Sequence, residues 1–189
     1  LLTQEQWDAI GVDQWVYGKG LPMNCPFPAS NRFFIVDEAV KMMLSTAPET
    51  PDAKEMCYAE FETTKFWSTH EWLRYIRGLE AGGATVGHYA LADENYGFSG
   101  SPNPEIVAAW FSAILKTDYE GYDRAVYKKT VEEFLVKVGR RKFIVPMYES
   151  MLNGDEKRQQ WAREIYKKAR PSYHPLSQGT LDALFASNE

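Results

Sequence analysis

Three consecutive cations, Arg140, Arg141 and Lys142, are the residues of this chain whose types and spacing could do chemistry. An arginine presents a planar fork of donors that matches a carboxylate, and a lysine supplies a compact positive charge. The cluster therefore predicts an anion-binding site. Three like charges in a row also repel one another, so the alternative is a solvated corner that interacts with the C-terminal end of a preceding helix. The spacing alone leaves both interpretations open.

Two helical patterns position this corner. The first has apolar residues at helical spacing and is predicted to end at Val138, with Gly139 supplying the positive φ that helix ends favour. The second is predicted to hold Pro146 in an early turn, where a missing N–H costs nothing. It continues through an apolar face to the stop at Asn153-Gly154.

One further motif resembles catalytic chemistry at first sight. His70-Glu71-Trp72-Leu73-Arg74 begins like a zinc-protease helix, but the position of the second histidine ligand holds Arg74. Glu71 is better explained as the capping-box partner of Ser68. The chain has 3 histidines in all, and their spacing predicts neither a metal site nor a catalytic residue in this chain.

Composition excludes several classes of function. The chain has 189 residues, a net charge of -5 and a pI near 5.3, which argues against a nucleic-acid surface. No apolar run approaches the roughly 20 residues of a membrane span, and no secretory pattern opens the chain. We therefore expect no membrane partner and a cytoplasmic protein. Cys25 and Cys57 are expected to be free thiols, and a start at Leu1 suggests a piece of a longer protein.

Helix signals recur along the chain from Ser30 onward. Candidate starts fall near residues 30, 50, 68, 85, 103, 118, 140 and 155, and no long period-two run indicates a sheet. Pairs of such helices give units of about 35 to 40 residues, the size of helical hairpins that stack into α-solenoids. The fold is therefore predicted to be all-α, with antiparallel helical hairpins stacked in sequence.

The two ends of the chain are expected to differ. Residues 1–28 are interpreted as a linker or strap, with a short helix from Gln4 to Ile10 and then an extended path, and residues 29–189 as the helical domain. The aromatic residues of the strap would anchor it on this domain or on one upstream. Near the C-terminus we expect a Glu164–Lys168 pair at i,i+4 and a final amphipathic helix.

Several stretches occur together in a familiar order. They are Trp15-Val16-Tyr17 with Gly20-Leu21-Pro22, Gly87-His88, Tyr96-Gly97-Phe98, Glu105-Ile106, Gly139-Arg140-Arg141-Lys142-Phe143 with Pro146, and His174-Pro175. None of them is specific alone, but their order and spacing together resemble the C-terminal domain of leukotriene A-4 hydrolase and its bacterial aminopeptidase relatives. These are zinc enzymes of the M-1 peptidase family. The likeness runs from about Trp15 to Leu181, nearly the whole chain.

The resemblance implies an armadillo- or HEAT-like helical domain that packs beside an upstream catalytic domain and closes one side of its substrate cleft. It implies that the zinc and its ligands belong to that upstream domain, and that the substrate is a peptide. In the family, an Arg and a Lys separated by one residue bind the free carboxylate of the substrate, and they match Arg140 and Lys142. Arg141 is assigned no such role.

A free-standing helical-repeat scaffold that binds a protein partner is the rival hypothesis. An upstream His-Glu-x-x-His in the parent reading frame would favour the aminopeptidase, and a Met directly before Leu1 would favour the scaffold. The sequence leaves open the preferred N-terminal residue of the substrate, any epoxide hydrolase activity and the oligomeric state.

Overall fold

The computed structural model describes residues 2–26, 30–50, 64–117 and 125–188. Every regular element among them is a helix, which confirms the all-α prediction. The chain divides into two compact units, Leu1–Asn31 and Arg32–Glu189. No helix of the described residues is long and apolar enough to cross a membrane.

The first unit contains two short helices where the sequence predicted one. Helix α1 spans Gln4–Ile10 as expected, under a capping box between Thr3 and Gln6. Gly11 then takes a φ of 70°, and α2, Val12–Tyr17, follows at once. Trp15 and Tyr17 therefore lie on a helix rather than on an extended strap, and Tyr17 is 81% exposed. Phe27 and Pro28 lie outside the described residues.

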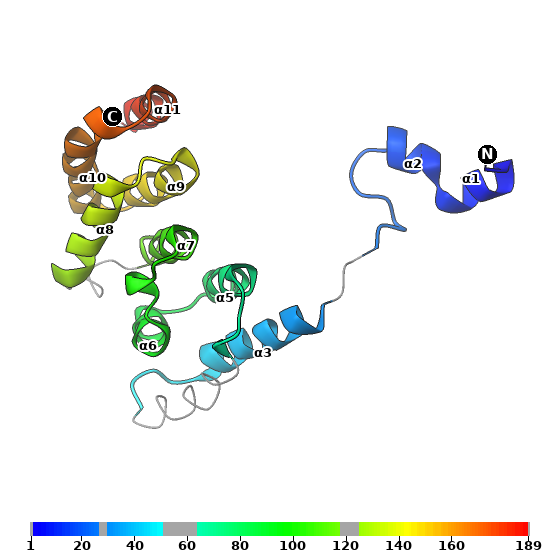
Figure 1. Ribbon diagram of the computed structural model, residues 1–189, viewed down its shortest axis with the longest axis horizontal. Coiled ribbons are helices and arrows are strands. Elements are labelled where there is room, and N and C mark those ends of the chain that lie inside the picture. The colour runs from blue at the N-terminus through cyan, green and yellow to red at the C-terminus, as the bar shows by residue number, and fades with distance from the viewer. Residues whose placement is uncertain (1, 27–29, 51–63, 118–124, 189) are drawn as a thin grey trace. The chain divides into compact units, whose positions relative to one another are not determined.

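The second unit holds the remaining helices (Figure 1). Their bounds are α3 Asn31–Ser45, α5 Thr69–Ala81, α6 Val86–Tyr96, α7 Pro104–Ile114, α8 Ala125–Lys137, α9 Arg141–Leu152, α10 Glu156–Ala169 and α11 Pro175–Ala186, with 3₁₀ turns η1 Phe98–Gly100 and η3 Arg170–Ser172. The helix starts predicted near residues 50 and 118, and Cys57, lie outside the described residues. Cys25 is a free thiol.

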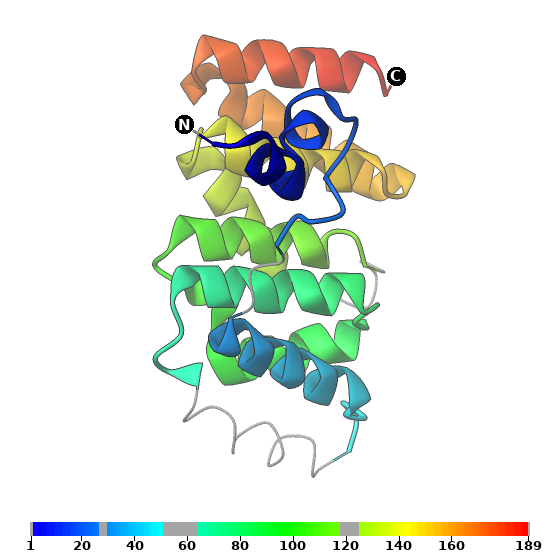
Figure 2. The same ribbon diagram turned by 90° about the vertical axis from the view of Figure 1, so that its right-hand side faces the viewer.

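Successive helices alternate between two layers within this unit. Helices α5, α7, α9 and α11 form one layer, and α6, α8 and α10 form the other (Figure 1). Contacts run along the first layer from α5 to α7, from α7 to α9 and from α9 to α11. Figure 2 shows α3, α5 and α7 lying side by side in order. This is the stacking predicted for helical hairpins, and it aligns every second helix along one face.

Local capping explains where many of these helices begin. Glu71 accepts hydrogen bonds from the backbone N–H of Ser68 at 2.8 Å and from its hydroxyl at 2.7 Å, as the capping-box interpretation predicted. Asn103 accepts from the Glu105 N–H before Pro104 opens α7. Asp155 accepts from the Arg158 N–H at the start of α10. Each cap satisfies a backbone donor that the first helical turn leaves unpaired.

Aromatic packing fills the centre of the stack. Gly97 takes a φ of 64° and turns the chain so that Phe98 enters the core between α5 and α7. The rings of Phe98 and Trp110 lie 4.6 Å apart, and Trp110 is fully buried. Buried aromatic side chains contribute a few kcal/mol each, so they hold the α5 and α7 layers together.

The corner between α8 and α9 differs from the prediction in two respects. Gly139 is not among the glycines with positive φ, so the helix end does not need its freedom. Gly139 instead leaves room for the ring of Tyr173, because a Cβ at this position would lie 3.3 Å from that ring. Pro146 also lies in the middle of α9 rather than in its first turn, because the helix already begins at Arg141. Pro146 has no N–H to offer the Lys142 carbonyl one turn before it.

Tyr173, which follows η3, and Ser177 of α11 fix the corner from the C-terminal side. The Tyr173 hydroxyl donates to the Leu135 carbonyl at 2.6 Å, and the Ser177 hydroxyl donates to the Gly139 carbonyl at 3.1 Å. Leu181 is fully buried, so the predicted final amphipathic helix is confirmed. The predicted Glu164–Lys168 pair is wrong: Lys168 pairs with Glu132 of α8 at 2.5 Å, because α8 packs beside α10.

Candidate functional site

The three cations of the corner open α9. Arg140 is the N-cap residue, and Arg141 and Lys142 form the first turn. The alternative interaction with the C-terminal end of α8 stays a prediction, and the three cations lie at the positive end of the α9 dipole. Cations there cost roughly 0.3 to 1 kcal/mol each, and an anion nearby is favoured instead. The positive side chains and the positive helix end therefore both favour an anion at this position.

Glu105 is the anion that the protein itself places at this end. Lys142 Nζ lies 2.9 Å from Glu105 Oε1, and Arg140 Nη1 lies 3.9 Å from the same oxygen. The hydrogen bond from Lys142, together with the charges of Lys142 and Arg140, holds the pKa of Glu105 below its usual value. The Arg140 and Lys142 side chains are 64% and 59% exposed, so water screens these ion pairs and they add little to the stability of the fold.

The ring of Phe143 supports both cations. The Arg140 guanidinium carbon lies 5.0 Å from the ring centroid and Lys142 Nζ lies 5.5 Å from it. Phe143 itself is buried, so the ring is a fixed surface against which two flexible side chains rest. Arg141 points elsewhere: its guanidinium lies 3.5 Å from the Thr180 hydroxyl on α11. The structure therefore brings Arg140 and Lys142 together and separates Arg141 from them.

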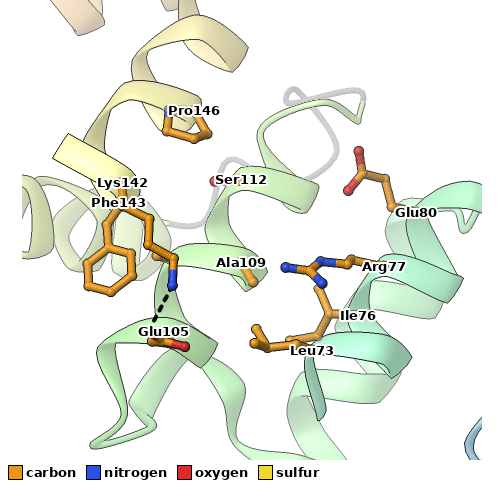
Figure 3. Close-up of a pocket in the computed structure, with 11 residues that line it drawn as sticks. Leu73, Ile76, Arg77, Glu80, Glu105, Ala109, Ser112, Lys142, Phe143 and Pro146 are labelled. Carbon is orange, nitrogen blue, oxygen red and sulfur yellow. Dashed lines mark hydrogen bonds and ion pairs between the residues drawn. The ribbon is translucent and has the colours of Figure 1, made fainter. Parts of the chain in front are cut away.

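Lys142 lines a groove between α5, α7 and α9 with a volume of about 210 Å³ (Figure 3). Its walls are largely apolar, with charged side chains at intervals. The lining residues are Leu73, Ile76, Arg77, Glu80, Glu105, Ala108, Ala109, Ser112, Lys142, Phe143 and Pro146. Arg140 does not line the groove but reaches its edge through Glu105. An apolar groove with a few charged groups suits the end of a chain molecule that carries an anion.

Two residues of this groove were missed by sequence reasoning. Glu105 entered the sequence analysis only within the Glu105-Ile106 stretch of the resemblance, and its contact with Lys142 depends on how α7 packs against α9. Arg77 had no assigned role. The spacing of Leu73, Arg77 and Glu80 at i, i+4 and i+7 would have placed them on one stripe of α5, beside the buried Ile76.

The histidine motif of α5 does not fit a metal ion. Glu71 is buried and also accepts two hydrogen bonds of 2.8 Å from the Arg32 guanidinium. Arg74 makes an ion pair of 2.6 Å with Asp37. Across the described ranges, no three His, Cys, Asp or Glu side chains gather where they could hold a metal. A zinc ion, which needs three protein ligands in a catalytic site, is not accommodated by these residues.

Comparison with known proteins gives a consistent result. Residues 67–185 match the family model described as "Leukotriene A4 hydrolase, C-terminal". Leucine aminopeptidase 2 of Neosartorya fischeri is 28% identical over 185 residues, which cover 96% of this chain and 26% of that protein. Aminopeptidase B of Mus musculus is 23% identical over 166 residues, covering 86% of this chain and 24% of that protein. The chain thus spans about a quarter of these curated relatives.

A solved structure shares the fold. Native leukotriene A4 hydrolase from Saccharomyces cerevisiae superposes with a TM-score of 0.69 at 18% identity, over 97% of this chain and 30% of that one.

Proposed function

Because this chain belongs to the family of leukotriene A4 hydrolase C-terminal domains, we propose that it is the helical domain of a larger zinc metallo-aminopeptidase and binds the free carboxylate of the peptide substrate. The similarity to proteins named aminopeptidases supports a peptidase parent. In this proposal a catalytic domain precedes the chain and carries the zinc. Residues 1–28 connect the two domains, and residues 29–189 close one side of the cleft.

The observation that carries the proposal is Lys142 at the start of α9, lining an apolar groove beside Arg140 and Glu105. A substrate carboxylate would take the place of the Glu105 carboxylate against Lys142. The exchange costs little because the existing ion pair is exposed. The terminal N–H groups of α9 add favourable potential for the incoming anion.

Binding the C-terminal carboxylate of a peptide would orient its N-terminal end. A carboxylate held at Arg140 and Lys142 fixes one end of a short peptide, so its N-terminal bond is presented to the catalytic domain in a restricted set of positions. Restricting a substrate in this way lowers the entropic part of the barrier. The residues of this chain would bind and orient the substrate, and the upstream zinc would supply the chemistry of bond cleavage.

The proposal is tested in the full-length enzyme with two substrates. Replacing Arg140 or Lys142 by Ala should lower kcat/KM for a tripeptide with a free C-terminus by about 10- to 150-fold, the equivalent of one charge-assisted hydrogen bond. An aminoacyl anilide lacks the carboxylate, so kcat/KM for it should fall little in the same variants. Arg141→Ala is the matched control, because its side chain points toward α11. Equal losses on both substrates would reject the carboxylate role.

The parent reading frame separates this proposal from the scaffold hypothesis. A zinc-protease motif encoded upstream of Leu1 is expected. The isolated 189-residue chain should fold, hold no stoichiometric zinc and hydrolyse no aminoacyl substrate. One tightly bound zinc per chain, measured by elemental analysis together with hydrolysis, would contradict the assignment of catalysis to an upstream domain.

A further inference from the structure

The wall of the groove opposite Lys142 carries a second cation, Arg77 of α5. Its side chain is exposed and lines the groove, and it makes no hydrogen bond or ion pair with any residue that the structure describes. Figure 3 shows its guanidinium extending toward Ala109 of α7, on the far side of the groove from Lys142. Arg74, one turn earlier on the same helix, is instead paired with Asp37.

The charges around the groove do not balance. Glu80 pairs with Lys116 at 2.5 Å, and Glu105 is shared by Lys142 and Arg140. Among the described residues that line the groove or pair with its carboxylates, four cations accompany two carboxylates, an excess of two positive charges. The whole chain has a net charge of -5, so this excess is local. A ligand with two negative charges would neutralise it.

The size of the groove limits where those two charges can lie. A volume of about 210 Å³ is smaller than the 300 to 1,000 Å³ typical of drug-sized ligand sites, so the groove has room for about one residue of a peptide. Two carboxylates in one residue occur when the C-terminal residue is Glu or Asp. The terminal carboxylate would lie at Lys142 and Arg140, and the side-chain carboxylate would lie at Arg77.

We infer that Arg77 is a specificity-determining residue of this groove, which binds the acidic side chain of a C-terminal Glu or Asp in the substrate. The inference rests on the proposed function, because it needs the terminal carboxylate at Lys142. The fork of a guanidinium matches a carboxylate in two parallel hydrogen bonds, and Arg77 has no such partner among the residues that the structure describes. The apolar surface of Leu73 and Ala109 would contact the methylene groups between the two carboxylates.

A pair of tripeptides that differ only in a C-terminal Glu or Gln tests this in the full-length enzyme. Arg77→Gln should lower kcat/KM for the Glu peptide by about tenfold and change that for the Gln peptide by less than about twofold. Arg74→Gln, on the same helix but outside the groove, should leave the Glu-to-Gln ratio unchanged. Arg77→Glu should reverse the preference in favour of a tripeptide that ends in Lys.

The kcat/KM of Lys142→Ala on both tripeptides and on the anilide distinguishes the proposed function from the inference about Arg77. One outcome is that Lys142→Ala lowers kcat/KM for both tripeptides relative to the anilide while Arg77→Gln leaves the ratio of kcat/KM between the Glu and Gln tripeptides unchanged. In that case the inference about Arg77 is overturned and the proposed function stands. If Lys142→Ala is not selective for the tripeptides, the proposed function fails, and the inference fails with it. An equal loss on both tripeptides in Arg77→Gln also overturns the inference, because Arg77 would then contact something that the two peptides share.

Discussion

Glu105 Oε1 accepts a hydrogen bond of 2.9 Å from Lys142 Nζ, and both side chains line the same groove. The free protein thus places a carboxylate of its own where we propose that the substrate carboxylate binds. The two carboxylates must compete for one ammonium group. Glu105 is therefore expected to weaken the binding of substrates, at a site where its sequence position indicates only the first turn of a helix.

Glu105→Gln should consequently lower KM for a free-carboxylate tripeptide by about two- to fivefold, since an exposed ion pair contributes less than about 1 kcal/mol. The anilide should be unaffected. Glu132→Gln, which breaks the exposed Lys168 pair between α8 and α10, is the matched control. A rise in KM would mean that Glu105 holds Lys142 in position rather than competing with the ligand.

Asp182 should make the stability of the second unit depend on pH in acid. The hydrogen bonds from Arg170 and from the Tyr166 hydroxyl lower its pKa to about 2. The folded pKa lies below the unfolded value near 3.9, so this stabilisation is present above about pH 4 and is lost as the pH falls toward 2. Asp182→Asn should flatten the decline of the urea midpoint between pH 5 and 3. Parallel declines in the variant and the wild type would contradict the assignment.

Arg158 should be the cation whose loss destabilises the fold most. It is 9% exposed, and its guanidinium donates to the Leu115 carbonyl at 2.7 Å and to the Thr117 carbonyl at 3.3 Å, beyond the C-terminal end of α7. Arg158→Met should lower the free energy of unfolding by about 2 to 4 kcal/mol, because the buried Leu115 carbonyl and the partly buried Thr117 carbonyl lose their donor. Urea titration measures this, with exposed Lys167→Ala as the control. A loss below 1 kcal/mol would show that solvent replaces the guanidinium.

The aromatic residues of the first unit should become protected in the full-length protein. Trp7, Trp15 and Tyr17 are 40%, 44% and 81% exposed on two short helices with no buried residue. Large apolar surface on such a segment is usually covered by a partner. Amide hydrogen exchange over residues 4–17 should slow by at least about tenfold when the upstream domain is present. Equal exchange in the two proteins would contradict this docking.

Features governed by near neighbours in the sequence were predictable. The capping groups of Thr3, Ser68, Asn103 and Asp155 lie within three residues of the donors they satisfy, so the starts of α1, α5, α7 and α10 followed from composition and spacing. The alternation of helices and short connections also predicted the stacked all-α fold. The resemblance to the family pointed to Arg140 and Lys142, whose binding role stays a prediction.

Features governed by packing between helices were not predictable. The role of Gly139 depends on the ring of Tyr173, which reaches it from another part of the chain, so a helix-end interpretation of the glycine was wrong. Lys168 found its partner on α8 rather than one turn away on its own helix. The groove combines residues from α5, α7 and α9, and neither Glu105 nor Arg77 carries a local signal for it.

The anchoring of the corner by Tyr173 and Ser177 also orders events during protein synthesis. The hydrogen bonds from Tyr173 to Leu135 and from Ser177 to Gly139 each join residues 38 positions apart. At about 5 to 20 residues per second, a ribosome delivers these anchoring residues roughly 2 to 8 s after the corner itself. Helices α5 to α7 can pack in that interval, whereas the start of α9 still lacks its supports. A nascent chain would therefore pack α5 to α7 before the start of α9 gains these two hydrogen bonds.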